Sequence, residues 1–206
     1  MPRIVAEKSD VVAAIAEVFR EHGYEGASLS QITATTGFGK GSLYHFFPGG
    51  KEDMATHILA HIDHWFETEI FAPLRTGDAA TAIARMMRSV ETYFQSGNRI
   101  CLVGAFALTG TRDRFATPIA GYFRRWISAL EGALHRTGLN QPQASQRAET
   151  AVLAIQGALV LARALNDETV FTRALHRIEA DLLRTARPAS QRPTGQGSGG
   201  LDGGAA

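Results

Sequence analysis

The sequence predicts an all-α protein of about nine helices, with a small N-terminal three-helix domain followed by a larger helical domain. Three observations lead to this prediction. Apolar residues recur at helical spacing along nearly the whole chain, and the alternation typical of strands is almost absent. Glycine and proline separate the periodic segments. The 206 residues, 45% of them hydrophobic and 20% charged, are enough to bury a core.

The first two helices have clear start and stop signals. The first is expected to begin near Ser9 and to stop at Gly23. The second is short and spans residues 29–36. Ser28 and Gln31 have the Ser-x-x-Gln spacing of a capping box, in which the Ser28 hydroxyl accepts from the helix start and the Gln31 side chain returns to the cap.

Two turns bracket a third, very short helix. Residues 37–39 read Gly-Phe-Gly and predict the first turn. The third helix is expected over 40–47, where Pro48 prevents its continuation. The fourth helix is predicted over 51–71, with acids in its first turn, where the helix dipole favours negative charge. Pro73 lies just beyond its expected end.

The rest of the chain is predicted to form five more amphipathic helices and a tail. The helices are expected near residues 78–96, 102–110, 113–137, 143–165 and 168–187. Residues 188–206 are rich in glycine and cannot bury apolar area, so we expect them to be disordered. We therefore divide the chain into a domain over 1–50, a second domain over 51–187 and this tail.

Two short helices joined by a glycine turn, over residues 28–47, have the outline of a helix-turn-helix, whose second helix enters the DNA major groove. At 100° per residue, the outer side of this helix carries Gly41, Ser42, Tyr44 and His45. The glycine permits close approach of the backbone, and the polar side chains can bond to phosphates or base edges. Spacing alone also allows an ordinary helical hairpin with a solvated outer face.

The charge distribution gives a mixed signal for DNA binding. The net charge is +1, and residues 1–52 carry five basic and six acidic side chains, so no global positive field attracts nucleic acid. Residues 27–50, however, contain no acid. Lys40 and Lys51 lie at two helix starts, where free amides also attract phosphate. With so few phosphate contacts per subunit, we expect binding to need two copies of the motif.

The stretch GYEGASLSQITATTGFGKGSLYHFFPGGKEDM, residues 23–54, resembles the N-terminal DNA-binding region of TetR-family transcriptional regulators. The matching features include the Gly-Tyr pair at 23–24 and the KGSLY segment at 40–44. The segments FPGGKE (47–52) and CLVGAFAL (101–108) resemble the LmrA/YxaF-like branch of that family.

The resemblance implies a helix-turn-helix protein that binds a pseudo-palindromic operator on double-stranded DNA. It places the DNA contacts at Ser28, Lys40, Gly41, Ser42, Tyr44, His45 and Lys51. One position departs from the family pattern. Many members have a hydroxyl residue before the lysine, whereas this chain has Gly39, so any phosphate contact of that hydroxyl is missing.

Two groove-binding helices must be held about 34 Å apart to read a two-fold site, which requires a dimer. The helices near 143–165 and 168–187 are assigned to this homodimer, because the resembled family forms a four-helix bundle from its last two helices. The supporting residues are Ala151, Ala154, Ile155, Ala158, Leu159, Ala162, Phe171, Ala174, Leu175, Ile178 and Leu182. A monomeric core would have the same periodicity.

The middle helices are expected to hold a pocket for a small-molecule effector, because large aromatic side chains and flexible methionines suit an adaptable site. The candidate ligand-binding residues are His61, Trp65, Met86, Met87, Val90, Phe106, Phe123 and Trp126. The same residues at helical spacing would also build an ordinary core.

No metal and no cofactor are expected. His57, His61 and His64 follow one another at i, i+4 and i+7. This spacing allows two of the histidines to bind zinc together, but it is wide for three ligands of one ion. We therefore favour a histidine face that is solvated or lies at the edge of a pocket. Cys101 precedes an apolar run and is interpreted as a structural thiol rather than a redox sensor. A single cysteine allows no internal disulfide framework, which fits a reducing cytoplasm.

These features together predict a cytoplasmic, ligand-responsive transcriptional regulator, with a repressor released by a small apolar or aromatic molecule as the main hypothesis. An activator would use the same residues, and a helical carrier without DNA binding is the alternative. No enzyme is expected, because the G-x-S-x-G, H-E-x-x-H and P-loop motifs are missing. No membrane association is expected, because the apolar run 151–165 is shorter than the roughly 20 residues that span a bilayer.

Overall fold

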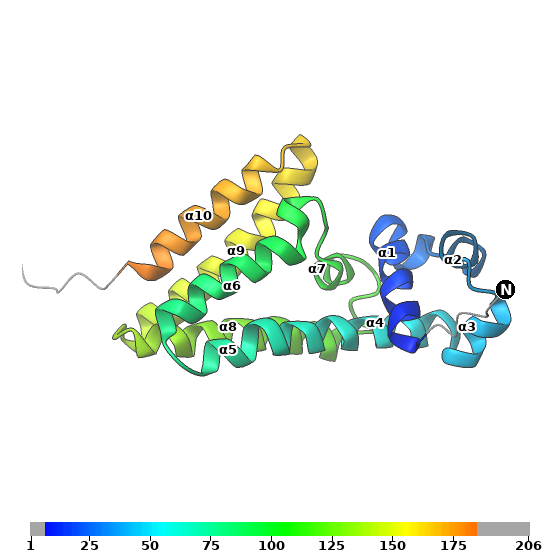
Figure 1. Cartoon of the computed structure of the whole chain (residues 1–206), viewed down its shortest axis with the longest axis horizontal. Coiled ribbons are helices and arrows are strands. Elements are labelled where there is room, and N and C mark those ends of the chain that lie inside the picture. The colour runs from blue at the N-terminus through cyan, green and yellow to red at the C-terminus, as the bar shows by residue number, and fades with distance from the viewer. Residues whose placement is uncertain (1–6, 185–206) are drawn as a thin grey trace, which may run out of the picture.

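The computed structural model describes residues 7–184, and every secondary-structure element in that range is helical (Figure 1). The helices are α1 (Lys8–Gly26), α2 (Leu29–Thr36), α3 (Lys40–Phe46), α4 (Gly50–Phe66), α5 (Ala72–Arg75), α6 (Ala79–Tyr93), α7 (Leu102–Ala107), α8 (Ala116–Arg136), α9 (Gln141–Leu165) and α10 (Thr169–Leu183). A π-helical segment, Glu67–Phe71, joins α4 to α5, and a 3₁₀ turn, Gln95–Gly97, follows α6. The predicted tail, 188–206, lies outside the described residues.

The fold class is confirmed, and the helix count agrees when continuous helices are counted once. Because α4, the π-helical segment and α5 form one rod, residues 7–184 contain nine helical rods. The first helix breaks at Gly23, where the sequence predicts its stop, since φ there is 67°. The predicted boundary between the first two domains falls where α4 begins, and it stays a prediction.

The fourth predicted helix is longer than the sequence indicates, and the prediction that it ends before Pro73 is wrong. In the π-helical segment, the backbone amide of Ala72 bonds to the carbonyl of Glu67, five residues earlier. The wider turn relieves the clash between a proline ring and the preceding carbonyls, and proline has no amide hydrogen to leave unpaired. The rod therefore continues through Pro73 to Arg75.

The α4 rod connects the two parts of the molecule. Figure 1 shows α1, α2 and α3 at one end, and α6, α8, α9 and α10 at the other. α4 packs against α1 at its start and against α8 further along. The ring of Phe66 lies 4.9 Å from that of Tyr122 and 5.3 Å from that of Trp126, measured between centroids. These buried aromatic contacts fix the far end of α4 in the larger core.

α9 is apolar on two faces, which corrects the predicted dimer residues. Most of the predicted residues on α9 and α10 are buried within their own protomer. They are Ala151, Ile155, Ala158, Leu159, Ala162, Phe171, Leu175, Ile178 and Leu182, while Ala154 and Ala174 are half-buried. The opposite face of α9 exposes Leu153, Val160, Leu161 and Leu165 by between 54% and 72%. Periodicity cannot choose between faces when both are apolar.

By length and composition alone, α9 could cross a membrane. Its 25 residues include an 18-residue window with a mean hydropathy of 1.5, so the helix is longer than the apolar run 151–165 from which no membrane association was expected. It packs between α8 and α10, however, and 39% of that window is buried. A core helix with this packing satisfies the same criteria, and the contacts with α8 and α10 make α9 part of the core.

Candidate nucleic-acid interface

α2 is held at its start by Ser28, as predicted. The Ser28 hydroxyl accepts a hydrogen bond from the Gln31 amide at 3.2 Å. The second half of the predicted capping box is wrong, because the Gln31 side chain lies 2.9 Å from Nε2 of His22 instead. The Ser28 amide donates to the carbonyl of Gly26. Gln31 thus ties α2 to the end of α1, and the two helices are fixed to each other.

The turn between α2 and α3 depends on glycine. Gly37 has a φ of 74°, in the left-handed region that glycine adopts without strain, and its amide bonds to the carbonyl of Thr33 at 3.1 Å. Gly39 occupies the N-cap of α3 and provides no side-chain hydrogen bond. The missing hydroxyl at this position leaves the first amides of α3 without a side-chain acceptor.

α3 presents its polar side to solvent. Leu43 and Phe47 are fully buried, and Phe46, predicted to lie with them, is half-buried. The five predicted contact residues on α3 are all exposed: Lys40, Gly41, Ser42, Tyr44 and His45. Apart from the adjoining residues and the backbone of α3 itself, no atom of the described residues lies within 4 Å of the position that a Cβ on Gly41 would take. The helix therefore has a free surface without an acid or a large aliphatic side chain.

Lys51 is predicted to contact phosphate, but it is held by the protein itself. Its Nζ lies 4.6 Å from the ring centroid of Tyr24, 3.4 Å from the backbone carbonyl of Glu25 and 3.9 Å from the Glu25 carboxylate. Arg114, from the loop after α7, donates to the Tyr24 hydroxyl at 2.9 Å. A phosphate at Lys51 would have to compete with Glu25.

Lys8 is also bound internally. The Asp53 carboxylate accepts from the Gly49 amide and lies 3.0 Å from Nδ1 of His57. Nε2 of His57 is 2.8 Å from Nζ of Lys8, which also lies over the ring of Phe47 at 5.2 Å. By contrast, Lys40 is exposed and forms no hydrogen bond or ion pair with the described residues. Lys40 is therefore the lysine best placed for phosphate.

The predicted ligand-binding residues do not gather around one cavity. Five of them are at most 3% exposed and pack in the core: Met86, Met87, Val90, Phe106 and Trp126. The indole NH of Trp126 lies 3.5 Å from the Met86 sulfur. Trp65 is half-buried and His61 is exposed. Phe123 lines a cavity of about 530 Å³ between α7, α8 and α9. The ligand-binding assignment therefore stays a prediction.

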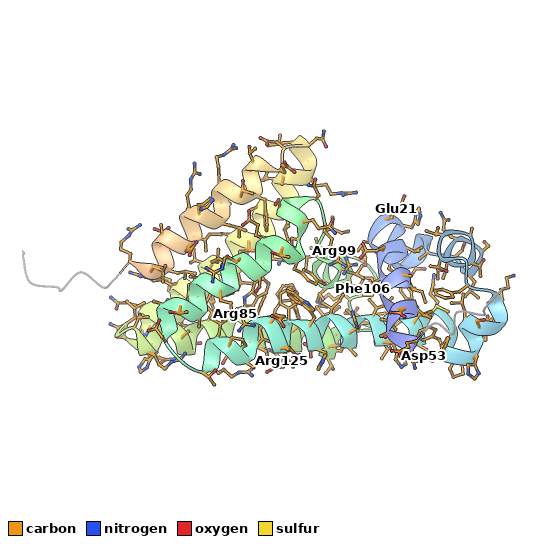
Figure 2. The ribbon with its side chains drawn as sticks, in the orientation of Figure 1. Glu21, Asp53, Arg85, Arg99, Phe106 and Arg125 are labelled. Atoms are coloured by element: carbon orange, nitrogen blue, oxygen red, sulfur yellow. The ribbon has the colours of Figure 1, made fainter. Side chains whose placement is uncertain are left out.

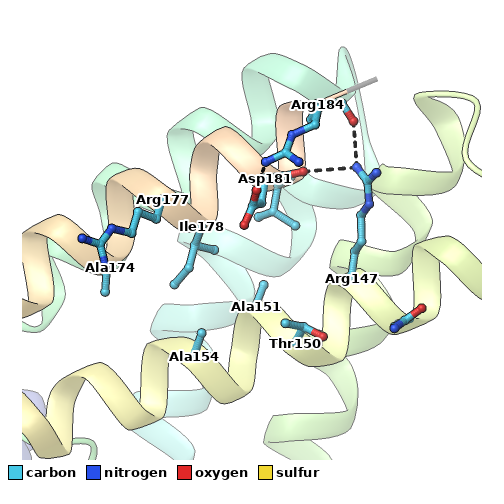
Figure 3. A pocket seen from close by; sticks show the side chains of 11 residues that line it. Arg147, Thr150, Ala151, Ala154, Ala174, Arg177, Ile178, Asp181 and Arg184 are labelled. Carbon is cyan, nitrogen blue, oxygen red and sulfur yellow. Dashed lines mark hydrogen bonds and ion pairs between the residues drawn. The ribbon is translucent and has the colours of Figure 1, made fainter. Parts of the chain in front are cut away.

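A second hollow of about 530 Å³ lies between α9 and α10 (Figure 3). Arg147 crosses it and donates to the backbone carbonyls of Asp181 and Arg184. Arg184 in turn pairs with the Asp181 carboxylate. Alanines and arginines line most of the groove, and it has fewer apolar walls than the cavity beside Phe123.

The two parts of the chain match two described families. Residues 11–58 match the bacterial regulatory proteins of the tetR family, and residues 79–177 match the LmrA/YxaF-like C-terminal domain of transcriptional regulators. The first match covers all of α2 and α3, and the second extends from α6 into α10.

The chain belongs to the TetR family. It is similar to the HTH-type transcriptional regulator LmrA of Bacillus subtilis, with 24% identity over 167 residues, covering 79% of this chain and 89% of LmrA. A TetR regulator from Legionella pneumophila has the same fold, with a TM-score of 0.72 and 20% identity, covering 87% of this chain and 99% of that one. The TetR-family regulator CifR, solved with 26-bp double-strand operator DNA, has a TM-score of 0.69 and 25% identity, covering 88% and 98%.

Membership in this family makes the protein a DNA-binding transcriptional regulator with an LmrA/YxaF-like C-terminal domain, and not an enzyme. Burial raises the pKa of the Cys101 thiol to about 11, so the regulator holds this side chain as a neutral thiol at physiological pH. Partial desolvation, together with His64, Arg20 and Arg99 nearby, lowers the pKa of His61. Within residues 7–184, no three His, Cys, Asp or Glu side chains are grouped to hold a metal.

Sequence reasoning missed two features of the regulator. Tyr24 belongs to the matching motif, but nothing local in the sequence shows that Lys51 and Arg114 meet on its ring. Gln156 and Arg163 line the cavity beside Phe123, and their spacing of seven residues on one apolar helix was the available signal.

Proposed function

We propose that this protein is a ligand-responsive repressor that acts in the cytoplasm as a homodimer on a pseudo-palindromic operator. The observation that carries the proposal is the exposed polar side of α3, with Lys40, Ser42, Tyr44 and His45 free of protein contacts that would block a groove. Ser28 at the start of α2 and Lys51 at the start of α4 complete the proposed contact set. CifR, whose structure contains operator DNA, has the same fold.

The uncovered face of α9 supports the dimer. Leu153, Val160, Leu161 and Leu165 place four large apolar side chains on one surface of one helix. Exposed apolar patches on a water-soluble domain mark interaction sites, and a second copy would cover this one. The groove between α9 and α10 adjoins the same surface. Ala154, Ala174 and Arg177 line both this groove and a neighbouring hollow, and Leu161 lines that neighbouring hollow as well.

The α4 rod offers a mechanical link between effector and operator. It begins next to α3 and ends in the aromatic core, so a tilt of its far end would change the spacing of the two α3 helices in a dimer. A small apolar or aromatic effector that prefers the released state by about 5.5 kcal/mol would move the population from 1:99 to 99:1. In this proposal the ligand therefore acts through differential binding to two conformations.

The test is binding of the purified protein to its own promoter DNA, measured by fluorescence anisotropy. We expect Lys40→Ala and Tyr44→Ala to weaken binding at least tenfold, and Arg88→Ala, an exposed control on α6, to leave it unchanged. A folded protein with no affinity for this DNA would instead be a ligand carrier. Loss of promoter activity on deletion of the gene would identify an activator.

A further inference from the structure

The cavity between α7, α8 and α9 has the size and walls of a small-molecule site. Its volume is about 530 Å³, and known sites range over roughly 300–1,000 Å³. The walls are mainly apolar and include Cys101, Leu108, Phe123, Leu159 and Val160. The raised pKa of Cys101 keeps its sulfur uncharged, so this thiol adds to the apolar wall.

Gln156 lines the cavity and has an amide donor that lacks a well-formed bond. Its buried Nε2 atom has no hydrogen-bond partner of normal geometry among the described residues, although the Gln156 amide acts on the Cys101 thiol and lowers the pKa of that thiol against the larger effect of burial. The other end of the amide packs against Gly104, where a Cβ would lie only 3.0 Å from Oε1. A buried donor left unpaired is unfavourable, so a ligand oxygen at this point would be favoured over a purely apolar group.

A cation lies two helical turns further along α9. Arg163 lines the cavity, is exposed, and forms no ion pair with any residue in the described part of the chain. Gln156 and Arg163 are seven residues apart and therefore share one face of α9, separated by about 10 Å along its axis. A guanidinium at an apolar cavity binds a carboxylate through two parallel hydrogen bonds.

We propose that this cavity binds the effector, and that the effector is an apolar carboxylate whose acid group pairs with Arg163 while a carbonyl or hydroxyl oxygen in its chain accepts from Gln156. The inference rests on the proposed ligand response and adds its site and chemical class. It moves the site away from the predicted ligand-binding residues, of which only Phe123 lines this cavity.

Three probes of equal chain length separate the two contacts: decanoate, methyl decanoate and 7-oxodecanoate, each titrated by calorimetry into the full chain. We expect decanoate to bind about tenfold more tightly than its methyl ester, and 7-oxodecanoate about fivefold more tightly than decanoate. Arg163→Gln should remove only the preference for decanoate over its methyl ester. Gln156→Leu should remove only the preference for 7-oxodecanoate over decanoate. Gln143→Leu on α9 and Arg88→Gln on α6, both exposed and outside the cavity, should keep both differences.

The proposal is overturned if no probe binds, or if either difference survives in its own variant. It is also overturned if Arg163→Gln changes the monomer–dimer equilibrium without changing probe binding, because the rim would then be an interface between copies. The same preparations are assayed on promoter DNA. If the protein binds promoter DNA but the probes do not show the expected differences in affinity, this site alone is rejected. If the protein does not bind promoter DNA, the proposed function is rejected.

Discussion

Tyr24 occupies the contact between the two parts of the molecule. Its ring is buried between Lys51 at the start of α4 and Arg114 in the loop after α7. Its centroid lies 5.7 Å from that of Phe115 and 5.9 Å from that of Phe106. The residue thus joins α1, α4 and the segment around α7 through one side chain.

We expect Tyr24→Leu to lower the free energy of unfolding by about 1–3 kcal/mol, because the aromatic contacts and the cation–π contact with half-buried Lys51 are lost. Tyr24→Phe keeps the ring and should retain most of this stability. The measurement is urea denaturation. Tyr44→Phe, on exposed α3, serves as the control, and equal stability of all three variants would contradict the role given to Tyr24.

Cys101 should make stability depend on alkaline pH. Burial raises its pKa from 9.0 to about 11, so between these values the thiol ionises in the unfolded chain and stays protonated in the folded one. The unfolded state then binds fewer protons, and stability falls as pH rises through this window. We expect the wild type to lose about 1–3 kcal/mol more than Cys101→Ala between pH 8 and pH 11. Parallel stability curves for the two proteins would refute this.

At the scale of elements, α1 is tied to the segment before α7 through Glu17. Its carboxylate accepts from Arg20 and from Arg99, each at 2.5 Å. Arg20 is buried and also donates to the Tyr93 hydroxyl, and the Arg99 guanidinium lies 4.7 Å from the Tyr93 ring centroid. Figure 2 shows Arg99 and Phe106 where the two parts of the molecule meet.

We expect Glu17→Gln to destabilise the protein by about 1–2 kcal/mol, since two neighbouring cations lose their shared anion. This expected loss of stability is smaller than for a buried ion pair, because the Glu17 side chain is 55% exposed. Glu21→Gln is the matched control one helical turn away, with only a 3.7 Å approach to His22. Urea denaturation of the two variants should separate them, and equal curves would show that the bridge adds nothing.

The elements themselves could be predicted where their signals are local. Gly23, Ser28 and Gly37 act through their own backbone or hydroxyl, and the sequence placed the first three helices within a few residues. The end of the α4 rod could not be predicted, because a π-helical turn removes the usual effect of Pro73. Contacts between distant residues, such as Glu17 with Arg99, leave no mark on local periodicity.

The candidate sites could likewise be predicted where their signals are local, and not where they depend on contacts between distant residues. The outer side of α3 could be predicted, because on a short helix the residues opposite the buried face must be exposed. The inner and outer faces of α9 could not, because both faces carry large apolar side chains: Ile155 is fully buried, whereas Leu153, on the other side of the helix, is 72% exposed. Lys51 was predicted to contact phosphate, and its contact with Tyr24 could not be predicted because it depends on how α1 and α4 pack.

For the whole molecule, the proposed dimer predicts the effect of a charge on α9. Leu161 is 54% exposed on the face assigned to the second copy. We expect Leu161→Glu to sediment as a monomer at micromolar concentration and to bind operator at least tenfold more weakly, since one α3 helix reads only half a site. Arg88→Glu, at an exposed position on α6 and outside the cavity, should remain dimeric. A dimeric Leu161→Glu would place the interface elsewhere.

Operator affinity should fall steeply with salt, because phosphate contacts release counterions. Each neutralised phosphate contributes about −0.9 to the slope of log K against log salt. Lys40 is exposed and free of ion pairs with the described residues, whereas Lys51 is already held near Glu25. We therefore expect Lys40→Ala to flatten the slope of a dimer by roughly 1.8, two contacts at about 0.9 each, and Lys51→Ala to flatten it less. Binding measured across a salt series decides this, and equal slopes for Lys40→Ala and wild type would remove α3 from the phosphate backbone.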